Sequence, residues 1–135
     1  MNRDWATSNW TRFTSTRNFN GNRPFRSVEA RHLRDLMLDV RRADRRARFV
    51  VLDVHGWTNE TIGHSHVGRF FNQEFGNGNR VSWGPGFLVT WAAERLNAEV
   101  SLIEFPMPRN SQDVRDSNFS GRFIGTVYSL MYDFR

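Results

Sequence analysis

Two stretches of the sequence place polar side chains where they could do chemistry. The first is Asp53-Val54-His55-Gly56, which follows the apolar run over residues 49–52. Asp53 and His55 are two residues apart, so on a strand both side chains project from one face. An imidazole with a carboxylate beside it is a common metal-ligand arrangement, because the carboxylate fixes the tautomer of the ring. A histidine that only caps a strand end is the structural alternative.

The second stretch covers residues 100–106, an apolar run that contains Glu104 and ends at Pro106. A carboxylate inside such a run is seldom buried without a partner. Structurally, Glu104 could pair with an arginine. Functionally, it could serve as a general base.

Helices are predicted to alternate with the strands that carry these residues. The expected elements are a helix from Ser27 into the arginine cluster of 41–48, a strand over 48–54, an irregular segment over 56–85 holding a short helix at 67–75, a helix over 87–97, a strand over 100–106 and a helix over 119–134. This order predicts an α/β fold, layered helix/sheet/helix, with a mainly parallel or mixed central sheet. So few strands make a thin sheet, which is expected to be part of a larger one.

The length of 135 residues predicts a single domain over 1–135, with an irregular N-terminal segment at 1–22. Cysteine is absent, which excludes disulfides, thiolate catalysis and Cys-ligated zinc. No run of apolar residues is long enough to span a membrane, and no signal peptide is visible. The sequence gives no indication of the compartment.

The basic residues are all arginine, and the formal net charge is +5. The cluster Arg41 to Arg48 is the best support for a nucleic-acid partner. It lies, however, at the expected end of a helix, where arginine offsets the macrodipole. No RNA-binding signature or helix-turn-helix spacing accompanies it, so a nucleic-acid partner is not expected.

Five stretches in order resemble the C-terminal half of the catalytic domain of zinc carboxypeptidases of the carboxypeptidase A type. They are Arg17-Asn18-Phe19, residues 24–30, residues 53–56, the helix of Trp91 and residues 102–106. The likeness covers about Trp10 to the C-terminus. It implies a partial carboxypeptidase-like (phosphorylase/hydrolase-like) fold, a zinc cofactor and a peptide substrate that loses its C-terminal residue.

The resemblance assigns roles to four residues. His55 matches the third zinc ligand of the family, and Glu104 matches the glutamate that takes a proton from zinc-bound water and delivers it to the leaving amine. Arg17 matches the arginine that grips the terminal carboxylate of the substrate, a task that suits a planar guanidinium. Val89 falls where the family tunes its side-chain pocket, so an apolar substrate end is expected.

The sequence also departs from the family pattern. Thr16 stands where the family has an asparagine, and neither Ser82 nor Trp83 is the tyrosine that closes over the substrate. The HxxE motif, which supplies the first two zinc ligands, should precede Arg17 and is missing. The site is therefore expected to be incomplete in this chain, with a missing N-terminal half supplying two ligands, and the chain alone should hold zinc weakly or not at all.

Three alternatives remain open. His64 and His66, with Glu60 and His55, could form a local zinc site, although solvated loop histidines are the favoured interpretation. The chain could be a non-catalytic remnant or a binding domain of the same fold. It could also be related to peptide amidases or deacylases of the same architecture.

Overall fold

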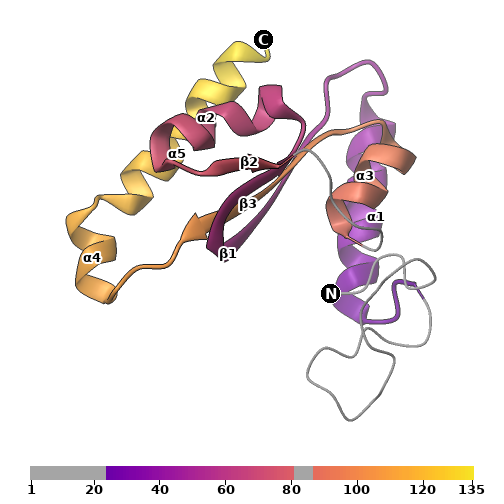
Figure 1. Cartoon of the computed structure of the whole chain (residues 1–135). Coiled ribbons are helices and arrows are strands. Elements are labelled where there is room, and N and C mark those ends of the chain that lie inside the picture. The colour runs from indigo at the N-terminus through magenta and orange to yellow at the C-terminus, as the bar shows by residue number, and fades with distance from the viewer. Residues whose placement is uncertain (1–23, 81–86) are drawn as a thin grey trace. The chain divides into compact units, whose positions relative to one another are not determined.

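A computed structural model describes residues 24–80 and 87–135 of the chain (Figure 1). The elements are α1 (Val28–Ala43), β1 (Val50–Gly63), α2 (Ser65–Phe75), β2 (Gly78–Arg80), α3 (Leu88–Leu96), β3 (Glu99–Pro106), α4 (Ser111–Asp116) and α5 (Phe119–Asp133). The strands form one sheet in the order β2-β1-β3, in which β1 and β2 pair in parallel with Glu60 opposite Gly78. The predicted α/β class is confirmed.

The chain divides into two compact units, which are described separately. Unit 1 comprises Met1–Val51 and Trp83–Val100, and unit 2 comprises Leu52–Ser82 and Ser101–Arg135. The single domain over 1–135 stays a prediction, and the irregular segment at 1–22 lies outside the described residues. No helix in the described part is long and apolar enough to cross a membrane.

Unit 1 contains α1 and α3. Helix α1 begins where the sequence predicts, because the Ser27 hydroxyl caps it by accepting a hydrogen bond from the Ala30 amide at 3.1 Å. The backbone amide at this helix start and the Ser27 hydroxyl hold the pKa of the exposed Glu29 carboxyl below its usual value. The apolar side chains buried on the two helices are Ala30, Met37, Leu88, Val89, Ala92 and Leu96.

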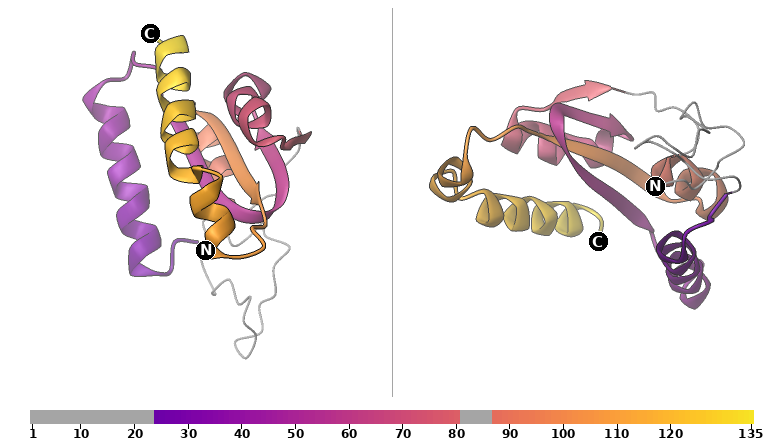
Figure 2. Two further views of the ribbon diagram at one scale, coloured as in Figure 1. Left: turned by 90° about the vertical axis from the view of Figure 1, so that its left-hand side faces the viewer. Right: turned by 90° about the horizontal axis from the view of Figure 1, so that it is seen from below.

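Unit 2 places α2 and α5 side by side over one face of the sheet (Figures 1 and 2). Phe71 of α2 is fully buried and packs against Phe123 of α5, with ring centroids 6.1 Å apart. Close approach of α2 to the sheet depends on Gly68, where an added Cβ would overlap the methyl group of Thr61 and lie 3.4 Å from Ser101 Oγ. The helices and the sheet therefore share a tightly packed core.

The structure corrects the predicted end of one strand and adds a helix that was not predicted. The strand predicted to end at Val54 continues to Gly63, so much of the segment predicted as irregular belongs to β1. Glycine tolerates extended backbone as well as turns, so Gly56 does not end the strand. Positive φ angles in β1 come later, at Asn59 with φ 57° and at Gly63 with φ 135°. Helix α4 was not predicted, because none of its residues is buried and it therefore lacks an apolar period.

Candidate active site

His55 and Asp53 meet on β1, as their two-residue spacing predicts. His55 Nε2 lies 2.8 Å from Asp53 Oδ1, with the imidazole about half exposed and the carboxylate mostly buried. A carboxylate that bonds one ring nitrogen fixes the orientation of the ring and directs the other nitrogen outward. Asp53 engages the Nε2 atom of the His55 ring. Nδ1 is therefore the nitrogen that could coordinate a metal.

Glu104 lies on β3 and is half-buried. Its Oε2 accepts from the Thr58 amide of β1 at 3.4 Å, which is a long contact for a hydrogen bond. This contact brings the carboxylate to the neighbouring strand, three residues beyond His55. The described residues therefore hold the carboxylate only loosely.

Asn77 is a residue of this site that sequence reasoning missed. It follows the left-handed C-cap Gly76 of α2 and is 7% exposed. Its amide nitrogen lies 3.3 Å from both Thr61 Oγ1 and the main-chain carbonyl oxygen of Glu104, to which it donates. Asn77 therefore ties the backbone of Glu104 to β1 and to the end of α2. The sequence carries no signal for this contact, because it joins residues that are far apart in the chain.

The structure does not test the roles of the other predicted site residues. Arg17 lies outside the described residues, as do Ser82 and Trp83. Val89 is the second residue of α3, and its side chain is fully buried in unit 1. The roles of Arg17 and Val89 in substrate binding stay predictions.

The two histidines predicted to lie in a loop belong to the start of α2. His64 is the N-cap residue and His66 lies in the first turn; their ring centroids are 5.5 Å apart, and His66 stacks on Phe134. Within residues 24–80 and 87–135, no group of three His, Cys, Asp or Glu side chains could hold a metal ion. Outside those ranges the sequence adds only Asp4. The local zinc site of His55, Glu60, His64 and His66 does not form.

A cavity of about 910 Å³ lies in unit 2 at the carboxyl end of β3. Gly56 of β1 and Phe105 of β3 both line it, together with His55. The carboxyl ends of strands in open α/β sheets are where ligands ordinarily bind. The candidate site therefore has an adjoining space that a ligand could enter.

Comparison with known proteins identifies similar chains but no family. No protein-family model matches the chain. Bacteriocin BCN5 of Clostridium perfringens is 30% identical over 114 residues, which are 82% of this chain and 13% of the bacteriocin. The murein-tripeptide amidase MpaA from Escherichia coli O157 has a similar structure, with a TM-score of 0.62 and 20% identity, over 93% of this chain and 50% of the amidase. The chain matches only part of each of these proteins, and the likeness to the amidase shows the fold.

Proposed function

We propose that the chain corresponds to the C-terminal half of the catalytic domain of a zinc-dependent amide hydrolase of the carboxypeptidase kind. In this proposal Glu104 is the general base and His55 is one zinc ligand. Arg17 binds the terminal carboxylate of a peptide substrate, and Val89 shapes the pocket for its side chain. The fold shared with an amidase supports this reaction class, and murein tripeptide is the first substrate to test.

The observation that carries the proposal is a backbone hydrogen bond that joins the chain just before β1 to the first residue of β3. The Glu99 amide donates to the Phe49 carbonyl oxygen at 2.8 Å. If the two strands continue in parallel from this bond, Gly56 lies opposite Phe105 and His55 lies opposite Glu104. Gly56 and Phe105 line the same cavity in unit 2, which is consistent with that pairing. Residues opposite each other in a ladder project from the same face of the sheet. The His55 imidazole and the Glu104 carboxylate would therefore both lie near one bond of a bound substrate.

The residues of this chain do not by themselves fit a catalytic zinc site. Such a site takes three protein ligands and keeps an open position for water or substrate. The Asp53-bonded His55 supplies one suitable ligand, and no group of three candidate ligands occurs in the described part of the chain. The proposal therefore requires two ligands from outside these 135 residues, as the missing HxxE motif also implies.

The purified 135-residue chain is expected to retain zinc well below one equivalent after dialysis, because a single histidine ligand binds zinc weakly. Elemental analysis of the dialysed protein measures this directly. The His55→Ala variant should retain the same small amount. One tightly held equivalent in the chain would contradict the expectation; its loss in a His64→Ala/His66→Ala variant would then locate the metal at the start of α2.

The test of function uses the complete polypeptide in which these residues occur, assayed on murein tripeptide and on peptides with a free C-terminal carboxylate. Release of an amino group is expected, with loss of activity on chelation and recovery with added zinc. A complete polypeptide that binds zinc in stoichiometric amount but hydrolyses none of these substrates would refute the proposal. The expected product from peptides is the free C-terminal residue.

A second candidate function is peptide binding without catalysis. The observation that favours it is the absence of three metal ligands among the described residues, together with the lack of further histidine, cysteine or glutamate in the rest of the sequence. A complete polypeptide that binds peptides with a free carboxylate, but holds no zinc and hydrolyses nothing, would establish this function instead.

A further inference from the structure

Asn77 lies between the C-cap of helix α2 and the first residue of strand β2. On one side, Gly76 ends α2 in the left-handed conformation, and its amide donates to the Asn72 carbonyl oxygen at 2.9 Å. On the other side, Gly78 begins β2 and pairs with Glu60 of β1. The backbone of Asn77 is therefore fixed in both directions, so its short side chain starts from a defined position.

The side-chain amide of Asn77 can face the strands in one orientation only. Its nitrogen lies 3.3 Å from the Glu104 carbonyl oxygen and 3.3 Å from Thr61 Oγ1, at the long end of the hydrogen-bond range. A carbonyl oxygen only accepts, so the group opposite it has to be the amide nitrogen, whose hydrogens serve both acceptors. Asn77 Oδ1 is left buried, with no hydrogen-bond partner among the described residues.

The buried oxygen of Asn77 is unfavourable for stability. A buried polar atom without a partner loses its hydrogen bonds to water and gains none in return. Each such atom in a folded protein calls for an explanation, and a catalytic role is one of the known explanations. An apolar side chain at position 77 would avoid the penalty, but it could not donate to Glu104. The asparagine is therefore explained by what its nitrogen binds.

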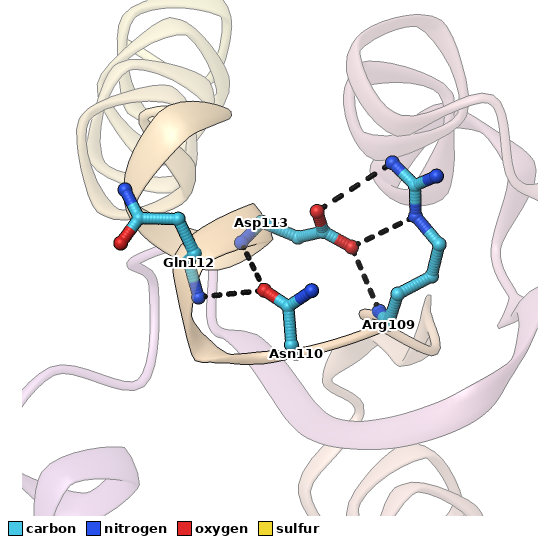
Figure 3. A network of polar contacts seen from close by, with 4 residues as sticks. All are labelled: Arg109, Asn110, Gln112 and Asp113. Atoms are coloured by element: carbon cyan, nitrogen blue, oxygen red, sulfur yellow. Dashed lines mark hydrogen bonds and ion pairs between the residues drawn. The ribbon is translucent and has the colours of Figure 1, made fainter.

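The other contacts around Glu104 do not fix the direction in which its side chain leaves β3. Ile103 and Phe105 are buried on either side of it, but apolar packing is not directional. The carboxylate itself has the long contact with the Thr58 amide at 3.4 Å. The next polar network along the chain, drawn in Figure 3, stays within residues 109–113 at the start of α4. The hydrogen bond from Asn77 is therefore the directional contact on the Glu104 backbone.

We infer that Asn77 is a positioning residue for Glu104. Its hydrogen bond holds the Glu104 peptide group in one orientation, and this orientation sets the direction in which the loosely held side chain leaves β3. The inference rests on the proposed function, in which the Glu104 carboxylate has to reach one bond of the substrate. Misplacement of a reacting group by about 1 Å can lower a rate about a hundredfold, so a small turn of this peptide group is enough to affect catalysis.

The test compares Asn77→Ala with Asn110→Ala in the complete protein, on the peptide or murein substrate that it hydrolyses. Each variant removes an asparagine side chain that makes two hydrogen bonds in unit 2, but those of Asn110 cap α4, at 2.8 and 2.9 Å. Asn77→Ala should lower kcat about ten- to a hundredfold with KM unchanged, and Asn110→Ala should change neither. In a Glu104→Gln background, Asn77→Ala should cause no further loss, because it acts through the carboxylate that is already replaced.

A second measurement, by NMR on the 135-residue chain, does not depend on hydrolysis. The carbonyl ¹³C signal of Glu104 should move in Asn77→Ala, which removes the donor to that oxygen, and should stay in place in Asn110→Ala. Asn77→Ser, whose side chain is too short to reach Glu104, carries the same expectations should alanine prevent folding.

Three results would each overturn the inference while the proposed reaction stands. They are an unmoved Glu104 signal, an equal effect of the two alanine variants on kcat, and a further loss from Asn77→Ala in the Glu104→Gln background. If the unaltered complete protein with zinc bound hydrolyses nothing, the proposed function fails, and the inference fails with it.

Discussion

Replacement of Glu104 by glutamine is expected to lower amide hydrolysis by the complete protein about 10²–10⁴-fold, the usual contribution of a general acid or base. Glutamine keeps the size of the side chain and can still accept from the Thr58 amide, but it cannot take up a proton at working pH. The zinc content and the unfolding midpoint should stay unchanged. Steady-state rates on murein tripeptide, with elemental analysis of the same samples, measure these quantities.

Glu99→Gln is the matched control, because Glu99 is a glutamate on the same strand. Its carboxylate pairs with Arg48 at 2.8 Å on the surface of unit 1. Removing this partly exposed ion pair changes stability by about 1 kcal/mol and should leave the hydrolysis rate nearly unchanged. If Glu104→Gln kept more than about a tenth of the wild-type rate, the loss would be too small for a general base, and Glu104 would not have that role.

Gly68→Ala is expected to destabilise unit 2 by about 1–3 kcal/mol, the usual cost of overfilling a packed core. The new methyl group would overlap Thr61 Cγ2, and Thr61 is itself 1% exposed, so it has little space into which to move. Val67 and Phe71 are fully buried on the same helix, which prevents α2 from withdrawing without opening a void. Urea denaturation followed by circular dichroism measures the loss.

Gly125→Ala provides the opposite expectation on the neighbouring helix. Apart from its chain neighbours and the backbone of its own helix, no atom lies within 4 Å of the position of its added Cβ. Alanine in a helix loses less backbone freedom on folding than glycine, so this variant should gain about 0.4–1 kcal/mol. If Gly68→Ala proved as stable as Gly125→Ala, the close approach of α2 to Thr61 would be wrong.

Local sequence signals predicted the elements that depend on neighbouring residues. Ser27 caps α1 as expected, α3 follows Phe87, and α5 occupies most of the segment predicted as the closing helix. The continuation of β1 past Gly56 was not predictable in this way. It depends on pairing with β2, which lies beyond α2 in the chain, and no local pattern in residues 57–63 indicates that partner.

The candidate site shows the same division between local and distant contacts. The Asp53–His55 pair follows from the period of a strand and could be predicted. The contacts of Glu104 with Thr58 and Asn77 join residues that are 46 and 27 positions apart, so they are known only from the fold.

The buried amide of Asn77 has a consequence for motion in this part of the molecule. The terminal residues of a strand ordinarily exchange their amide hydrogens readily, because they open without disturbing the core. The Glu104 carbonyl oxygen accepts a hydrogen bond from the side chain of Asn77, which comes just after α2 and also donates to Thr61 of β1. Local fraying of β3 at Glu104 would therefore break contacts to β1 and to the end of α2. The backbone beside the proposed base should therefore open as rarely as the interior, which keeps the carboxylate in register between successive encounters with substrate.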